Sequence, residues 1–449
     1  MNKKISSFLS LIIMASVISA KELKYPVSSI PASLKENAHT VMRLYQQEVE
    51  IKSEKLAIVK VTEVRTILNK NGVQNTLFME LYSPMNKISN IKGKMYNELG
   101  EKIKNLSSDD IIDHSFIIGY TMYDDNRVKF YDPKNLTYPL TVEYSYEIDL
   151  KQTLFLPTWS HDVENVSFEK SIFIFKTPAD YPFRYKEYNI EKPVEKSKDG
   201  DKDVYIWSLN NLGARNHEPM SSNTLPSYPM VKLVPKNFEV GDTKGSTESW
   251  KDLGEWVTTL IDKKDKLPES TISKMKEISA SCNSEFEKVK KVYEFMQQKT
   301  RYVSIQVGIG GWQPFDAELV DKNSYGDCKA LANYTKSLLS AAGIKSYYTL
   351  VKAGATNQNF DAAFPSSQFN HAIVCVPIDK DTLWLECTSQ RLPCGFNSDF
   401  TDDRQVLLID GVNSHLAHTR IYPASENSIT RTSNVILSDI ESGTALTKT

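Results

Sequence analysis

The spacing of hydrophobic and polar residues changes about halfway along the chain. In the first half, apolar residues recur at every second position in short runs such as 55–64 and 139–148, and Gly-, Asn- and Pro-rich turns follow them. Such runs are typical of half-buried antiparallel strands. In the second half the apolar spacing is three and four, as at 249–261, which predicts amphipathic helices. The pattern predicts an α+β protein, with an antiparallel β-sandwich at 21–245 and a second, α+β domain at 246–400.

Two segments of the first half carry finer predictions. Residues 69–72, Asn-Lys-Asn-Gly, are typical of a hairpin turn, so we expect the strand at 55–64 to pair with a strand at 75–82. Residues 220–245 are rich in Ser, Pro and Gly, which indicates an inter-domain linker at the end of the sandwich.

Both ends of the chain differ from its middle. Residues 1–20 have a short basic start, an apolar run and a small-residue end, which predicts a secretory signal peptide too short to span a bilayer. No later run is long and apolar enough for a membrane span. We therefore expect an exported protein, periplasmic or extracellular, with no integral membrane segment after signal removal. Residues 401–449 return to a β-like pattern, and we expect this short C-terminal β segment to begin a further, truncated β domain.

Composition narrows the range of functions. The net charge of the 449 residues is −2 at pH 7 and no basic run stands out, so nucleic acid is not an expected partner. The glycine-rich loop at 308–314 lacks the Gly-Lys-Ser/Thr ending of a phosphate loop, and we expect no cofactor and no metal. Five cysteines in an exported protein imply at least one free thiol, and a loop closed by Cys387 and Cys394 stays open as an alternative.

Candidate chemistry begins at Tyr-Gly-Asp-Cys-Lys, residues 325–329. This stretch places Cys328 in the first turn of a predicted helix that ends near Gly343, where unpaired N–H groups favour a thiolate. His371 begins a predicted strand, and Glu386 lies on its hairpin partner, near the position opposite. A cysteine alone is more often a buried apolar residue than a nucleophile. The combination, however, has the order of a nucleophile, its base and the group that orients the base.

These motifs, with Asn370-His371 and Trp384-Leu385-Glu386-Cys387-Thr388, resemble the transglutaminase-like superfamily, which has a papain-type fold. The whole chain resembles bacterial envelope proteins in which an uncharacterised N-terminal β-sandwich precedes such a domain. The resemblance implies that Cys328 is the nucleophile, His371 the base and Glu386 the acid. Two positions depart from the family pattern: Glu replaces the more usual Asp at 386, and Ala330 stands where related proteins often have an acidic residue.

The resemblance implies acyl transfer through a thioester, with hydrolysis by a cysteine peptidase or amidase expected over transamidation. The oxyanion is expected against the backbone N–H of Cys328 and one further donor, for which Gln306, Trp312 and Gln313 are the candidates. The expected substrate is a protein, a peptide or a cell-wall-derived molecule. The alternative is a catalytically weak or inactive envelope module that binds peptides, glycans or cell-wall fragments, and a structural envelope subunit is a third hypothesis. The sequence makes no prediction of oligomeric state.

Overall fold

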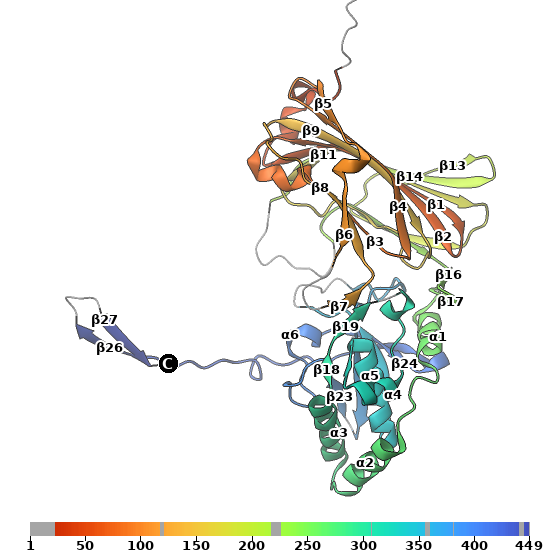
Figure 1. Ribbon diagram of the computed structural model, residues 1–449, viewed down its shortest axis with the longest axis vertical. Helices are drawn as coiled ribbons and strands as arrows, with labels where there is room; N and C mark the ends of the chain where they lie inside the picture. Colours follow the sequence, from red (N-terminus) through yellow and green to blue (C-terminus); the bar gives the residue numbers. More distant parts are fainter. Residues whose placement is uncertain are drawn as a thin grey trace, which may run out of the picture.

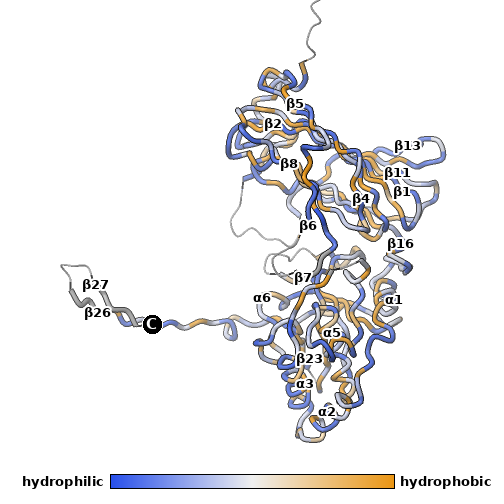
Figure 2. Tube along the Cα trace, viewed as in Figure 1, coloured by the Kyte–Doolittle hydropathy of each residue, from blue (hydrophilic) through white to orange (hydrophobic). Residues whose placement is uncertain are grey.

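The computed structural model describes residues 23–116, 121–216, 226–306, 308–354, 360–379, 381–439 and 444–448. The signal peptide predicted at 1–20 lies outside these residues. Figure 1 shows a β-rich upper part and a lower part that contains the helices. In Figure 2, hydrophobic and hydrophilic residues alternate along the strands of the upper part. The prediction of a chain that combines a β-rich region with a helix-containing one is confirmed.

The largest sheet lies in the upper part. Within the described residues it holds eight strands in the order β13-β14-β11-β1-β2-β9-β4-β5. Their bounds are β1 (Thr40–Ser53), β2 (Leu56–Ile67), β4 (Asn86–Tyr96), β5 (Lys102–Asn105), β9 (Leu140–Leu150), β11 (Val166–Pro178), β13 (Glu195–Asp199) and β14 (Lys202–Leu212). Within this sheet the prediction of an antiparallel arrangement is wrong at one place, because β1 pairs with β11 in parallel. Alternation of side chains shows which face of a strand is buried but not the direction of its neighbour.

Smaller sheets pack against this large sheet. In the described part of the chain, two are three-stranded, and they consist of β10 (Trp159–Ser160), β15 (Met230–Pro235) and β12 (Phe183–Tyr188), and of β3 (Phe78–Tyr82), β8 (Arg127–Tyr131) and β6 (Ile112–Ser115). One hydrophobic core joins Phe173 and Trp207 of the large sheet to Phe78 and Val231 of the smaller ones. The upper part is therefore layered around one main core, and a smaller cluster of Val27, Ile30, Leu34 and Val41 lies beside it.

The hairpin expected at residues 69–72 does not form. β2 pairs with β1 and β9, whereas β3 pairs with β8 in another sheet. A 3₁₀ helix, Lys70–Thr76, follows β2 instead of a reversal. Gly72 is needed there for space, since a Cβ atom on it would lie 2.6 Å from the His39 carbonyl oxygen.

The lower part combines helices with a second sheet. Its helices are α1 (Trp250–Ile261), α2 (Glu269–Ala280), α3 (Glu285–Lys299), α4 (Ala317–Asn323), α5 (Cys328–Ala341) and α6 (Ser398–Thr401). Among the described residues, its sheet has five strands in the order β23 (Asp381–Leu385), β22 (His371–Ile378), β21 (Tyr347–Val351), β24 (Gln405–Ile409) and β25 (His415–His418). Helix α5 lies in the core of this part, because Leu331, Tyr334, Leu338 and Leu339 are fully buried on it.

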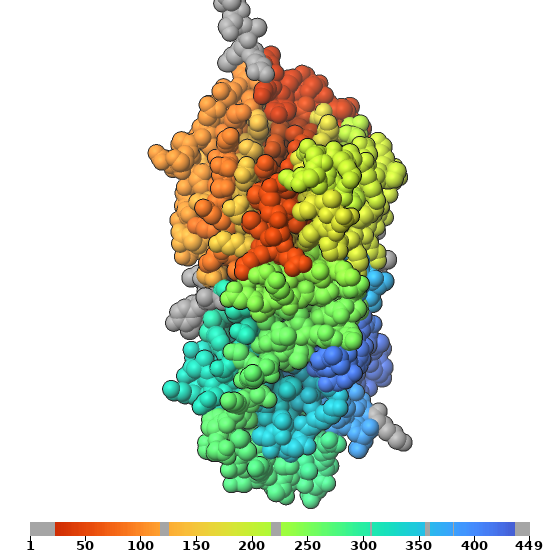
Figure 3. Space-filling model, turned by 90° about the vertical axis from the view of Figure 1, so that its right-hand side faces the viewer, coloured from red at the N-terminus to blue at the C-terminus, as the bar shows by residue number. Residues whose placement is uncertain are grey.

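The two parts meet over a continuous surface. In the space-filling view of Figure 3, the upper part, coloured red to yellow-green, sits directly on the lower part, coloured green to blue. The segment expected to be a linker contributes strands there, namely β15, β16 (Asn237–Val240) and β17 (Thr243–Ser246). No helix within the described residues is long and apolar enough to cross a membrane.

Short strands complete the chain. β18 (Arg301–Tyr302) pairs with β20 (Tyr325–Gly326), β19 (Ser304–Gln306) pairs with β7 (Thr121–Asp124), and β26 (Asn434–Asp439) pairs with β27 (Thr444–Lys448). The β26–β27 hairpin stands away from both parts at the end of an extended segment (Figure 1). Single 3₁₀ turns lie at Val27–Ser29, Ala32–Leu34, Ser108–Asp110, Gly308–Gly311 and Gly411–Asn413.

Candidate active site

Cys328 is the first residue of helix α5. Asp327 caps this helix, since its carboxylate accepts a hydrogen bond of 2.9 Å from the backbone N–H of Ala330. Gly326, just before the cap, has no positive φ, so a left-handed backbone conformation is not the reason for a glycine here. A Cβ atom on Gly326 would lie 2.8 Å from the Ala330 Cβ, and glycine therefore lets the chain pass close to the helix that carries the cysteine.

His371 is the first residue of strand β22, and its position is held by the residue before it. The Asn370 side chain accepts from the backbone N–H of Ala353 at 2.7 Å and donates to the Ala353 carbonyl at 3.1 Å. Glu386 directly follows strand β23, whose register places Leu385 opposite Val374. The hairpin β22–β23 thus carries both side chains, as the sequence predicts.

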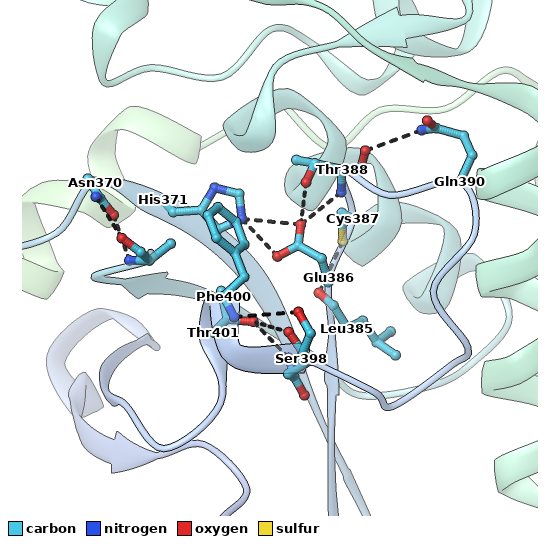
Figure 4. A network of polar contacts seen from close by, with 12 residues as sticks. Asn370, His371, Leu385, Glu386, Cys387, Thr388, Gln390, Ser398, Phe400 and Thr401 are labelled. Atoms are coloured by element: carbon cyan, nitrogen blue, oxygen red, sulfur yellow. Dashed lines mark hydrogen bonds and ion pairs between the residues drawn. The ribbon is translucent and has the colours of Figure 1, made fainter. Parts of the chain in front are cut away.

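The His371 ring and the Glu386 carboxylate are hydrogen-bonded (Figure 4). Nε2 of His371 lies 3.0 Å from Oε2 and 3.2 Å from Oε1 of Glu386. Oε1 also accepts from the backbone N–H and the hydroxyl of Thr388, at 3.0 and 2.5 Å. Only 2% of Glu386 is exposed, so this carboxylate is held by hydrogen bonds on two sides and is shielded from water.

The contacts among Cys328, His371 and Glu386 shift the pKa of each group toward its charged form. Burial raises the pKa of the Cys328 thiol, but the hydrogen bond with His371 and the charge of His371 outweigh burial and lower it. Burial lowers the pKa of His371, but the Glu386 charge and the hydrogen bonds with Cys328 and Glu386 raise it to about 10. Burial raises the pKa of Glu386, whereas His371 and Thr388 lower it below its ordinary value. The three shifts therefore all favour the charged forms of these groups, with a thiolate beside an imidazolium.

A cavity of about 170 Å³ opens at Cys328. The described residues that line it are Gly311, Trp312, Cys328, Lys329, Tyr348, Leu350, Phe369, Asn370, His371 and Ala372. Glu386 is not among them, because it lies behind the imidazole. The cavity therefore presents the cysteine and the histidine to a ligand, with apolar walls around them.

The three oxyanion candidates differ in their placement. Trp312 lines the cavity, whereas Gln313 is not among the described residues that do. The backbone N–H groups of Trp312 and Gln313 both donate to the Ile309 carbonyl, at 2.8 and 2.9 Å. Gln306 ends strand β19, and its side chain lies outside the described part of the structure. Of the two candidates whose side chains the structure describes, Trp312 lines the same cavity as Cys328 and Gln313 does not.

The upper part of the molecule supports the Trp312 wall. Phe155 stacks on the Trp312 ring with a centroid distance of 4.8 Å. Strand β7 pairs in parallel with β19, and the Asp125 carboxylate accepts from the Gly308 N–H at 3.0 Å. The glycine-rich loop that carries Trp312 is therefore held by residues from both parts of the chain.

Sequence reasoning assigned no role to several residues around the triad. Phe400 packs edge-to-face on the His371 ring at 5.2 Å, and Thr388 holds Glu386 (Figure 4). The Tyr293 hydroxyl donates to the backbone carbonyl of Glu386 at 2.7 Å. Thr388 belongs to a motif that was visible in the sequence, and Tyr293 lies on the buried face of helix α3, whereas nothing local indicates the contact of Phe400 with His371.

Two further points concern the pairing of the cysteines and the side chains that could hold a metal ion. Each of the five cysteines lies in the described residues and is a free thiol, so Cys387 and Cys394 form no disulfide. Burial raises the pKa of Cys375 and Cys394 to about 12, which leaves both protonated at neutral pH. In the described part of the chain, no group of three or more His, Cys, Asp and Glu side chains is arranged to hold a metal ion.

Comparison with known proteins gives a family match and a solved structure of similar fold. Residues 56–216 match the model of a domain of unknown function with solved structure, DUF3857. A crystal structure titled "putative protease", from Parabacteroides distasonis ATCC 8503, is similar with a TM-score of 0.63 and 14% identity, over 85% of this chain and 72% of that one. An M1 zinc metallopeptidase from Deinococcus radiodurans has a TM-score of 0.25 and 8% identity, over 54% of this chain and 53% of that one, and this score is too low to indicate a shared fold. No curated protein matches. The Parabacteroides structure thus shares the fold of this chain.

Proposed function

We propose that this protein is a cysteine acyl-transfer enzyme that hydrolyses amide or peptide bonds. The observation that carries the proposal is the hydrogen-bonded series Cys328–His371–Glu386, with a lowered thiol pKa and a raised imidazole pKa, at the wall of a cavity. Perturbed pKa values of partnered groups in a cleft are typical of catalytic sites. The name of the Parabacteroides structure, a protease, agrees with this chemistry.

The reaction would proceed in two steps. The Cys328 thiolate attacks the amide carbon, and the imidazolium of His371 gives its proton to the leaving amine, so that a thioester and a free amine form. Neutral His371 then takes a proton from water, whose oxygen attacks the thioester and releases the acid and the thiolate. Glu386 keeps the proton of Nε2 in place and stabilises the imidazolium in both steps. The oxyanion would lie against the Cys328 backbone N–H and the Trp312 indole N–H.

The same proposal covers the domain organisation of the chain. Residues 246–400 would form a transglutaminase-like domain with a papain-type fold, behind a β-sandwich at 21–245 and an export signal at 1–20. The match of residues 56–216 to DUF3857 supports this architecture, since the domain lies where the resemblance places the sandwich. Export would bring the enzyme to peptide or cell-wall-derived substrates in the envelope.

Selective alkylation tests the proposal. At neutral pH, a low dose of iodoacetamide is expected to label Cys328 faster than the half-exposed Cys282, with peptide mass mapping as the readout. His371→Ala should abolish this preference, whereas His415→Ala, at an exposed histidine of β25, is the matched control and should keep it. Equal, slow labelling of wild type and His371→Ala would contradict an activated thiol.

Turnover separates the enzyme from the alternative of a binding module. Wild-type protein incubated with an envelope peptide mixture should generate new amino termini, and Cys328→Ala should generate none. If both proteins bind the peptides equally and neither forms product, the protein is a binding module.

A further inference from the structure

Trp312 and Phe369 form aromatic parts of the wall of the cavity at Cys328. Trp312 directly follows the glycine-rich 3₁₀ turn, and Phe369 ends the segment 360–369 that leads to the catalytic histidine. Both of these segments belong to the lower part, and both are contacted by residues of the upper part. The shape of the cavity therefore depends on contacts that the upper part makes.

Phe155 of the upper part is held in place to meet Trp312. The Gln152 side chain accepts a hydrogen bond from the Phe155 N–H at 2.7 Å and donates one to the Phe155 carbonyl at 3.2 Å. Of the adjoining residues, Leu154 is buried in the hydrophobic core of the lower part and Leu156 in that of the upper part. This short segment is thus anchored in both cores, and it presents the Phe155 ring to the Trp312 ring at a centroid distance of 4.8 Å.

The segment that ends at Phe369 closes on itself. The backbone N–H of Asp361 donates to the side-chain oxygen of Gln368 at 2.9 Å, and the Gln368 amide donates to the Asp361 carbonyl at 3.0 Å. At its two ends, the rings of Phe360 and Phe369 pack with a centroid distance of 5.4 Å. Because the segment is cross-linked in this way, a displacement of Asp361 would be transmitted to Phe369.

Strand β12 of the upper part holds this segment from the other side. Lys186 forms an ion pair with the Asp361 carboxylate, and the Tyr188 hydroxyl donates to the same carboxylate at 2.6 Å. Arg184 donates to the Pro365 carbonyl at 2.7 Å. Residues two apart in a strand share a face, so all three side chains leave β12 on the same side. The Asp361 side chain is only 12% exposed, and charge-assisted hydrogen bonds shielded from water in this way are strong.

We propose that the upper part completes the substrate cavity of the lower part by holding the walls at Trp312 and Phe369. Phe155 and Asp361 are the positioning residues, since neither is among the described residues that line the cavity. The catalytic side chains, by contrast, are held by neighbours in the lower part. The contacts should therefore govern the fit of a substrate more than the reactivity of the thiol. This inference rests on the proposed function, and it gives a role to the region 56–216 that matches DUF3857.

Two electrophiles of different size test this role. Iodoacetamide requires only a reactive thiol, whereas N-benzyl-iodoacetamide also brings a phenyl ring that can pack against the aromatic walls. The readout is the ratio of the benzyl rate to the iodoacetamide rate at Cys328, by peptide mass mapping, divided by the same ratio for a free cysteine peptide. Phe155→Ala and Tyr188→Phe should each lower this ratio about two- to tenfold and leave the iodoacetamide rate within about twofold of wild type.

Matched variants separate this role from a contribution to folding alone. Phe286→Ala changes an exposed phenylalanine of α3, and Tyr146→Phe removes a tyrosine–carboxylate bond to Glu80 within the upper part. Both controls should keep the wild-type ratio, even where they lower the Tm. A lower Tm with an unchanged ratio in Phe155→Ala and Tyr188→Phe would overturn the proposal, and so would a ratio near one in wild type.

Hydrogen exchange keeps this inference separate from the reactivity of the thiol. The backbone N–H groups of Trp312 and Asp361 are both hydrogen-bonded within their own loops. Phe155→Ala should speed exchange at Trp312, and Tyr188→Phe should speed it at Asp361, each about two- to tenfold. If iodoacetamide does not label the catalytic cysteine of the wild type, the proposed function fails. Unchanged exchange at both positions would refute the role of the upper part whatever the activity of the protein.

Discussion

Replacing Glu386 by Gln would change the proton arrangement of the whole site. The Gln carbonyl oxygen can still accept from the N–H and hydroxyl of Thr388, which hold Oε1 of Glu386. Its NH₂ group would then face Nε2 of His371, so that Nε2 must accept and the ring proton moves to Nδ1. A neutral imidazole protonated at Nδ1 cannot take the thiol proton. Glu386→Gln therefore removes the ion pair while keeping the size of the side chain.

Two independent estimates give the decrease in the alkylation rate of Cys328 that Glu386→Gln should cause. A thiol with an ordinary pKa of about 8.5 is about 3% ionised at pH 7, so alkylation of Cys328 should become slower by up to about 30-fold. The hydrogen bond that is lost, of 3.0 Å to a charged partner, contributes about 1.5–3 kcal/mol, or about 10- to 150-fold. The two estimates agree, and we expect a decrease of up to about 30-fold.

The assay is the rate of iodoacetamide labelling between pH 5.5 and 9. In wild type the lowered thiol pKa should make the rate fall less steeply below neutrality than that of an ordinary thiol. In Glu386→Gln the rate should instead fall about tenfold for each pH unit below about 8. Glu386→Asp is the control, since it keeps the charge and has the acid more usual in the family that the sequence resembles. A wild-type rate and pH profile in Glu386→Gln would refute this account of the site.

Three further predictions concern the surroundings of the triad. Thr388→Val removes the hydroxyl that donates to Glu386 and should slow Cys328 labelling about three- to tenfold with an unchanged circular dichroism spectrum; an unchanged rate would contradict it. Gly326→Ala places a Cβ 2.8 Å from that of Ala330 and should cost about 1–3 kcal/mol of folding free energy, seen as a lower Tm. Adding Ala330→Gly should restore part of the Tm. If the two substitutions lower the Tm additively, a clash between the two Cβ atoms is not the cause. The raised pKa of His371 stabilises the folded state fully below about pH 6.5, and this contribution is lost as pH rises through about 10. The Tm difference between wild type and His371→Ala should therefore shrink from pH 7 to 10, and a growing difference would reverse the sign of this argument.

The parts of the site that depend on local chemistry could be predicted from the sequence. Asp327 is a helix cap, and helix α5 begins at the next residue, as the pattern indicates. A continuous apolar run places β22 at His371–Ile378, and a short turn returns the chain to Glu386. Helix caps and hairpins involve residues within a few positions of one another, so a local pattern is sufficient to detect them.

The parts of the fold and of the site that depend on distant segments could not be predicted from the sequence. Nothing local indicates that β1 pairs in parallel with β11, or that Phe155 stacks on Trp312. The pairing of Lys186 with Lys232 is equally non-local, because it joins strands separated by more than 40 residues. Side-chain alternation defines the faces of a strand, whereas its neighbours depend on the packing of the whole core.

The pairing of β7 with β19 has a consequence for the order in which the molecule folds. It joins segments about 180 residues apart, and the bond between Gly308 and Asp125 spans 183 positions of sequence. Contacts of such separation form slowly, because the closure entropy of a long loop must be overcome first. Helix α5 and the β22–β23 hairpin, by contrast, need only near neighbours. The cysteine and the histidine should therefore be in place before the Trp312 wall closes around them, and maturation of the cavity should be among the last events of folding.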